Sequence, residues 1–483
     1  MLRILKHLVL AGLLAWVAWS WSRYQIGATV YDYDEADYMF AASRGFLANS
    51  ADSPSLSLAQ FVRMGLSRGG DPSQKSDLSV LIRDSGDMNA YRHWHGPLFY
   101  DGLALAPADA SEHFVRVLAL AAPLLGLAVI FLGCLWLWPD PQGTLAAVIS
   151  SLLFLWSPAV IKTTEIAPHL LFAAVCLAAL FATAKFRESG KRSHWYAALA
   201  LCGVAFCTME LAFALIVAVL ICGHLERERL LHGAGGADGW VGLAWRSIAA
   251  FIAPVLVLWP GGLLKLNFIK SYLFMAYLAV FRKNAWGDVT FAQTWSFRFR
   301  AMPAEWVALA LALSLFFGWR FLRGRDFPGG RPISAFLIFG AIMLLAVLRV
   351  NSFGLRYVLP FFPALLVFTG CVLAAAMSGL PVALRAGLVA LLAALVFVDT
   401  ERQMNTRAPE PDPQWVARLA AVRDPRWQGK TLLIPQGEVP TLHFYFQDIT
   451  FRGYWDDSTI PSRLAAQHFD GVIYPAETAV RVP

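Results

Sequence analysis

Long apolar runs separated by short polar stretches make up most of this 483-residue chain. An α-helix needs roughly 20 mostly apolar residues to cross the hydrocarbon core of a bilayer. About eleven runs approach that length, at residues 5–22, 114–138, 143–161, 168–185, 194–208, 210–224, 247–263, 304–322, 333–349, 357–377 and 381–399. The pattern predicts an all-α polytopic membrane protein.

Composition supports this prediction. Hydrophobic residues make up 58% of the chain and the mean hydropathy is +0.54, whereas soluble domains are about 45–50% apolar. The net charge of +7 comes from Lys and Arg gathered in particular loops, which is the positive-inside pattern of membrane proteins and does not indicate nucleic-acid binding. All six cysteines fall inside apolar runs, so no disulfide framework is expected: Cys134, Cys176, Cys202, Cys207, Cys222 and Cys371.

The basic loops also predict the topology. The N-terminus and the stretches 185–192, 227–246 and 320–331 are rich in Lys and Arg and should lie on one side of the membrane. A single helix over 194–224 would place two of these loops on opposite sides. We therefore predict a hairpin of two short helices with its apex near Thr208-Met209-Glu210. This arrangement gives a cytoplasmic N-terminus and an extracytoplasmic C-terminus.

Three long segments then lie outside. Residues 23–113 form a first outer loop whose apolar and basic positions, such as Leu58, Phe61 and Arg63, predict amphipathic helix on the membrane surface. Residues 264–303 form a second outer loop, which is basic and is therefore an exception to the positive-inside rule. It is either assigned to the wrong side or a functional basic patch. The tail, 400–483, is long enough for a small α/β domain beside the transmembrane domain, 1–399. Strand-like runs in it lie at Thr431–Pro435, Leu442–Phe446 and Gly471–Tyr474.

The first outer loop opens with an acidic cluster at residues 31–38. Ionisable groups at a membrane boundary are costly and are usually functional. Asp34 and Glu35 are candidates for abstracting a proton from an acceptor group or for binding a metal. The alternative is a solvated acidic loop.

Two further segments carry candidate residues. His93 and His95 flank a tryptophan late in the first outer loop; they suit a divalent metal shared with Glu35, or hydrogen bonds to a phosphate. The alternative for them is interfacial aromatic packing. Arg349 and Arg356 flank a short turn before a helix, and arginine is well suited to binding phosphate. The alternative for them is snorkelling to lipid headgroups.

Smaller signals come from Lys162, Glu165, His169 and Glu210. In the predicted topology, these residues lie on the same face of the membrane as the acidic cluster. Snorkelling residues that act independently should appear on both faces. The convergence therefore favours one site on the outer face.

Taken together, these segments resemble the GT-C glycosyltransferases that use polyprenyl-phosphate-linked sugars, in particular the family 39 protein mannosyltransferases and the lipid A aminoarabinose transferases. The matching elements are Asp34-Glu35-Ala36-Asp37-Tyr38, His95-Gly96-Pro97-Leu98 and Arg356-Tyr357-Val358-Leu359-Pro360-Phe361-Phe362-Pro363. They occur in the same order over about the first 400 residues. Two departures affect donor and acceptor identity: His95-Gly96-Pro97 replaces a Lys-Pro-Pro element, and Glu165 stands where Asp is expected.

The resemblance implies an enzyme that transfers a sugar from a polyprenyl-phosphate donor to a lipid, glycan or protein acceptor, with inversion at the anomeric carbon. It implies that Asp34 is the general base and that Glu35 orients it or shares a divalent metal with His93 and His95. Arg356 would neutralise the departing phosphate, assisted by these residues: His95, Lys265, Lys270 and Arg349. It also implies residence in a bacterial inner membrane.

Two other classes compete with this interpretation. A transporter or flippase for lipid-linked sugars should have charges near mid-membrane and broken helices in paired halves. A membrane assembly subunit would tolerate loss of the carboxylates. The long first outer loop and the few charges inside the apolar runs favour the enzyme.

Overall fold

The computed structural model describes most of the chain. The described residues are 2–25, 31, 33–47, 95–107, 110–161, 166–231, 236–264, 266, 268–269, 272, 289–348, 350–404, 413–454 and 457–482. The predicted amphipathic helices around Phe61 lie outside them.

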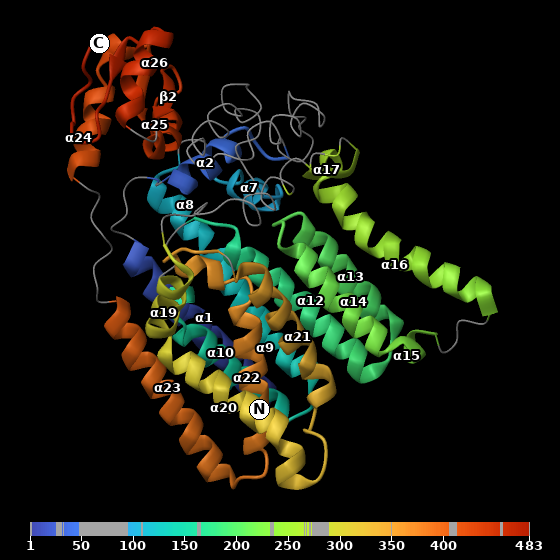
Figure 1. The fold of residues 1–483 in the computed structure, drawn as a ribbon. Coiled ribbons are helices and arrows are strands. Elements are labelled where there is room, and N and C mark those ends of the chain that lie inside the picture. Colours follow the sequence, from blue (N-terminus) through green and yellow to red (C-terminus); the bar gives the residue numbers. More distant parts are fainter. Residues whose placement is uncertain are drawn as a thin grey trace.

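Long helices form a bundle (Figure 1), and shorter ones lie at its ends. The long helices are α1 (Leu2–Gln25), α8 (Glu112–Ala119) running into α9 (Ala121–Leu137), α10 (Gln142–Trp156), α12 (His169–Ser189), α13 (Arg192–Phe206), α14 (Ala212–Leu225), α16 (Gly236–Leu258), α20 (Pro303–Arg323), α21 (Gly330–Val347), α22 (Phe362–Met377) and α23 (Val382–Met404). The shorter ones are α2 (Tyr33–Ala42), α7 (Leu98–Leu103), α11 (Pro158–Ile161), α15 (Arg227–Leu231), α17 (Pro260–Leu264), α19 (Phe291–Ala301) and the 3₁₀ turn η2 (Leu355–Val358). Helix α12 lies at the centre, in contact with α9, α13, α14, α21 and α22.

Each of the eleven predicted spans coincides with a helix, and the all-α polytopic prediction is confirmed. Among the described residues, five helices are long and apolar enough to cross a membrane: Glu112–Leu137, His169–Ser189, Gly239–Leu258, Gly330–Val347 and Val382–Gln403. A sixth span arises if α19 and α20 are taken as one bent pair, with an angle of 89° between them. Large apolar side chains point outward from the bundle, including Phe321 (93% exposed) and Val257 (74%). A surface of this kind suits lipid rather than water.

The predicted hairpin is confirmed. Helices α13 and α14 are separated by a break at residues 207–211. At the other end of the hairpin, the Arg192 guanidinium donates to the carbonyl of Leu230 from Nε (3.0 Å) and Nη2 (2.6 Å). The two basic loops that flank the hairpin therefore meet at one end of the bundle, which we call the α15 end.

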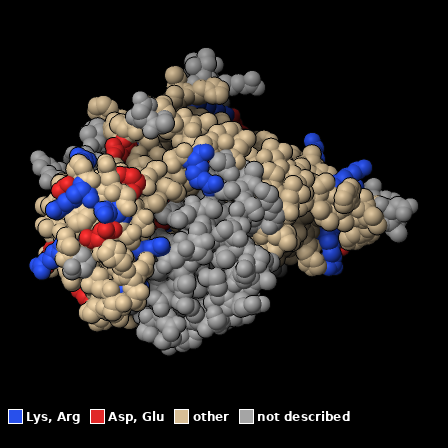
Figure 2. All heavy atoms as spheres, turned by 90° about the horizontal axis from the view of Figure 1, so that it is seen from above, with Lys and Arg blue, Asp and Glu red and all other residues tan. Residues whose placement is uncertain are grey.

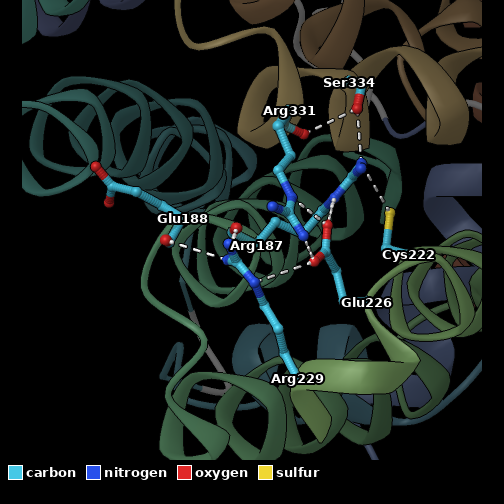
Figure 3. Close-up of polar contacts among 7 residues, drawn as sticks. All are labelled: Arg187, Glu188, Cys222, Glu226, Arg229, Arg331 and Ser334. Atoms are coloured by element: carbon cyan, nitrogen blue, oxygen red, sulfur yellow. Dashed lines mark hydrogen bonds and ion pairs between the residues drawn. The ribbon is translucent and has the colours of Figure 1, made fainter.

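The other basic segments also meet at the α15 end (Figure 3). Three arginines surround the carboxylate of Glu226, which is 1% exposed. Arg187 Nε lies 3.3 Å from its Oε1, Arg331 Nε donates to Oε1 at 2.6 Å, and Arg229 Nε lies 3.7 Å from Oε2. The N-terminal helix joins this end through an ion pair between Lys6 and Asp140. Residues from all four basic segments thus meet at one end of the bundle, as the predicted topology requires.

The chain ends in a small α/β unit, residues 413–482, which we call the C-terminal unit. It contains a three-stranded parallel sheet with strand order β2-β1-β3. Its elements are α24 (Pro413–Val422), β1 (Thr431–Pro435), α25 (Val439–Tyr445), β2 (Thr450–Tyr454), α26 (Ile460–Ala466) and β3 (Gly471–Val472). The strand predicted at Leu442–Phe446 is wrong, because that stretch lies largely in helix α25.

The C-terminal unit lies over the opposite end of the bundle, which we call the α2 end (Figure 1). Figure 2 looks onto this end. Charged side chains of both signs gather over the part of the view that the C-terminal unit occupies, whereas most of the rest of the described surface is uncharged. Helix α25 packs directly on α2.

Candidate functional site

The acidic cluster forms helix α2 at the top of the bundle. Its first turn carries Asp34 and Glu35, and negative side chains there are favoured by the helix dipole. The two neighbouring carboxylates point to different partners. This difference decides what each of them can do.

Asp34 pairs with Arg356. Its Oδ2 accepts a hydrogen bond from Arg356 Nη2 at 2.6 Å, although the two residues are 322 positions apart in the chain. The side chains are 34% and 19% exposed, respectively. Arg356 lies in η2, and its guanidinium also covers the ring of Tyr357 at 5.1 Å from the centroid. The structure therefore brings together the predicted base and the predicted phosphate ligand.

Glu35 forms a buried bidentate pair with Arg116 of α8. Both distances, Nη1 to Oε1 and Nη2 to Oε2, are 2.6 Å, and the side chains are 4% and 3% exposed. Glu35 Oε1 also accepts the backbone N–H of Ile166 at 2.9 Å. These bonds tie α2 to α8 and to the segment that enters α12. This placement favours an anchoring role for Glu35 over a chemical one.

His95 lies against the apex of the hairpin formed by α13 and α14. Its Nδ1 is 2.7 Å from Glu210 Oε2, and both side chains are largely buried. The next residue, Gly96, packs so closely on the backbone of Cys207 that an added Cβ would lie 2.2 Å from its carbonyl oxygen. Leu98 N–H donates to that same oxygen at 3.0 Å. Glycine is therefore required at this position to seat His95.

His169 lies between the His95 side of the site and the Arg356 side. It is the first residue of α12 and is 5% exposed. Its ring centroid lies 6.2 Å from that of His95 and 6.0 Å from that of Tyr357. Its Nδ1 has no hydrogen-bond partner within the described part of the chain. The groups Asp34, Arg356, Tyr357, His169, His95 and Glu210 thus follow one another across the α2 end.

The remaining candidates lie outside the described residues: His93, Lys162, Glu165, Lys265, Lys270 and Arg349. The described donors do not fit the metal site expected from Glu35 and His95. Both oxygens of Glu35 are bound by Arg116, and His95 is paired with Glu210. No three His, Cys, Asp or Glu side chains converge in the described ranges.

Three contributors were missed or undervalued in the sequence. Arg116 was missed, although a cation inside a predicted span is a recognised sign of a buried partner. Glu210 and His169 were noted without a role. Nothing in the sequence connects either residue to His95, since contacts over more than seventy residues leave no local pattern.

Comparisons with known proteins concern the fold of the chain. No protein-family model matches the chain, and no curated protein matches its sequence. The oligosaccharyltransferase of Archaeoglobus fulgidus in its apo form is similar in structure, with a TM-score of 0.54 and 12% identity over 92% of this chain. In complex with an inhibitory peptide and a dolichol-phosphate, that archaeal enzyme, AglB, gives 0.56 and 13% over 93%.

The bundle has the GT-C fold. This chain spans only 64% and 65% of the length of the two archaeal structures. ArnT from Cupriavidus metallidurans in its apo state has a TM-score of 0.48 and 16% identity, over 85% of this chain and 88% of its own. The fold and the apolar helices make the chain an integral, multi-pass membrane protein.

Proposed function

We propose that this protein is a membrane glycosyltransferase. It would transfer a sugar from a polyprenyl-phosphate donor to a lipid, glycan or protein acceptor, by direct displacement with inversion at the anomeric carbon. The reaction would take place at the extracytoplasmic face, with the N-terminus in the cytoplasm of a bacterial cell and the C-terminal unit outside.

One observation carries the proposal: the 2.6 Å contact between Asp34 and Arg356. A carboxylate next to an arginine supplies the two functions that displacement at a sugar phosphate needs. The carboxylate accepts a proton from the attacking group, and the guanidinium stabilises the anion that leaves. In the archaeal AglB complex of the same fold, the bound lipid is a dolichol-phosphate.

The ion pair itself suggests how the reaction begins. Arg356 forms an ion pair with Asp34. A donor phosphate offers Arg356 oxygens that it can bind in a bidentate manner, so donor binding draws the guanidinium away from Asp34 and frees the carboxylate. The pair is partly exposed, and ion pairs that solvent reaches contribute little, roughly 0–1 kcal/mol, so this exchange of partners is inexpensive.

The chemical step forms one bond and breaks one bond at the anomeric carbon. The acceptor oxygen or nitrogen forms a bond to the anomeric carbon and gives its proton to Asp34. The bond between that carbon and the phosphate oxygen breaks, and the electron pair leaves with the polyprenyl phosphate. Arg356 holds the resulting anion. His95, kept in place by Glu210 at 2.7 Å, provides a second hydrogen-bonding group at this end of the bundle.

The experiment is mass spectrometry of glycolipids and glycoproteins from cells that carry the full-length protein, Asp34→Asn, Arg356→Gln or no protein. The matched control is Asp140→Asn, which removes the carboxylate of an ion pair at the α15 end. We expect a glycosylated product with the wild-type protein and the control only. Wild-type amounts of product from Asp34→Asn would overturn the proposal and favour a transporter, flippase or assembly subunit.

A further inference from the structure

Helix α2 is too short to fix its own orientation. It has ten residues, and isolated helices of that length are marginal in water. Neighbouring elements must hold it. From below, Glu35 is bound by Arg116; from the side, the Tyr38 ring packs against Phe99 of α7, with centroids 5.8 Å apart.

The third contact comes from the C-terminal unit. The Tyr445 hydroxyl, at the end of α25, accepts a hydrogen bond from the backbone N–H of Tyr31 at 3.1 Å. The same hydroxyl donates to Glu112 Oε1 at 3.0 Å. One side chain from the end of the chain thus joins the entrance of α2 to the first turn of α8, the helix that also supplies Arg116.

Ring contacts extend this interface between α25 and α2, which we call the joint, along α2. Before the helix, the Tyr31 ring meets Phe444 edge-on at 5.3 Å and stacks on Tyr445 at 6.3 Å. Near its end, the Phe40 ring lies 4.9 Å from His443. Helix α25 therefore contacts α2 at both ends, and contact at two points fixes the direction of an axis.

We propose that the C-terminal unit holds α2 in the orientation that directs Asp34 at the reacting group, and that Tyr445 is the positioning residue of this joint. The inference rests on the proposed function, because the proposed role of Asp34 as base requires α2 to hold one orientation. It assigns a role to a part of the chain in which sequence patterns indicate none.

The protonation state of Tyr445 suits this role. Burial, followed by the nearby Glu112, raises the pKa of the Tyr445 hydroxyl well above its usual value. The hydroxyl therefore remains protonated at every pH at which the protein is folded in a cell, and it can donate to Glu112 throughout.

The test compares two Tyr→Phe variants of the full-length protein. Tyr445→Phe removes the hydroxyl that reaches α2 and keeps the ring. Tyr454→Phe removes a hydroxyl that donates to the carbonyl of Ile473 at 2.7 Å inside the C-terminal unit. Because Arg356, which would bind the donor phosphate, is not on α2, we expect Tyr445→Phe to lower kcat by about tenfold with little change in KM for the donor. Tyr454→Phe should leave kcat unchanged.

Hydrogen exchange supplies a readout that does not depend on activity. Amides of residues 33–42 should exchange faster in Tyr445→Phe and at the wild-type rate in Tyr454→Phe. Equal exchange and equal kcat in the two variants would overturn the inference. If exchange changes as expected but the wild-type protein transfers no sugar, the proposed function fails and the joint between α25 and α2 stands.

Cross-linking tests positioning directly. The six native cysteines are all buried, so a bifunctional maleimide should react with Phe40→Cys and His443→Cys selectively. In the Tyr445→Phe background, the cross-link should restore most of kcat, and the same variant without reagent should not recover. A cross-linked protein that keeps the full loss would show that the hydroxyl acts in another way and would refute the inference.

Discussion

The pair formed by Glu35 and Arg116 gives the sharpest prediction, because its two members were assigned no common role by sequence. Consider Glu35→Gln. The pair is 4% and 3% exposed and bidentate, so the substitution takes the Glu35 counter-charge away from the buried Arg116 guanidinium. Removing one member of a buried pair costs about 3–5 kcal/mol. Since 1.4 kcal/mol is a factor of ten, the unfolded population should rise by roughly a hundred- to a few thousand-fold.

The double variant Glu35→Gln with Arg116→Met separates anchoring from chemistry. It removes both charges, and the glutamine oxygen can still accept the Ile166 N–H, which lies 2.9 Å from Oε1 in the native protein. Replacing a whole buried pair by uncharged groups is often close to neutral. We therefore expect most of the stability to return. An anchoring role for Glu35 predicts that glycosyl transfer stays within about tenfold of wild type.

The assays are thermal unfolding in detergent, followed by dye binding, and transfer activity per folded molecule. A double variant that is as stable as wild type yet inactive would refute the anchoring role and place Glu35 in the chemistry. A single Glu35→Gln variant with wild-type stability would contradict the estimate for the buried pair. The two outcomes test different steps of the reasoning.

Three further predictions follow from single contacts. Gly96→Ala should reduce activity at least tenfold, because an added Cβ meets the Cys207 carbonyl oxygen at 2.2 Å and overpacking costs about 1–3 kcal/mol; Gly102→Ala, with nothing within 4 Å, should not. Glu226→Gln should lower thermal stability by roughly 3–5 kcal/mol without altering KM, since its three arginines gather at the α15 end. Asp470→Asn should speed hydrogen exchange of β1 at pH 7. The bond from the Thr431 N–H, followed by Lys430, lowers the pKa of Asp470, so its contribution is present above the usual carboxyl pKa of about 3.9 and fades as pH falls through the lowered value.

The helices, and the gathering of the basic segments at one end of the bundle, could be predicted because the membrane imposes a simple rule on sequence. A span must be apolar along its whole length, and basic residues mark its cytoplasmic end. The hairpin apex at residues 207–211 followed from that rule alone, and the contact of Arg192 with the Leu230 carbonyl bears it out. The roles of neighbouring helices in the bundle could not be predicted, since lipid-facing and protein-facing apolar residues look alike in sequence.

The C-terminal unit shows where local patterns fail. The aromatic run Leu442–Phe446 has the composition of a strand, yet it lies largely in α25, which begins at Val439 with a proline in its first turn. Proline at that position favours helix initiation. The aromatic side chains of this run contact α2 and the residue Tyr31 before it, and no window of the sequence contains both partners.

The candidate site shows the same limit of local sequence patterns. Asp34 and Glu35 are adjacent, and their sequence context does not distinguish them. The structure does so through exposure: the pair of Glu35 is almost fully buried, whereas Asp34 and Arg356 are 34% and 19% exposed. Ion pairs that solvent reaches add only roughly 0–1 kcal/mol to stability. Asp34→Asn should therefore fold as well as wild type, so any loss of transfer that it causes belongs to the chemistry of that carboxylate and not to the fold.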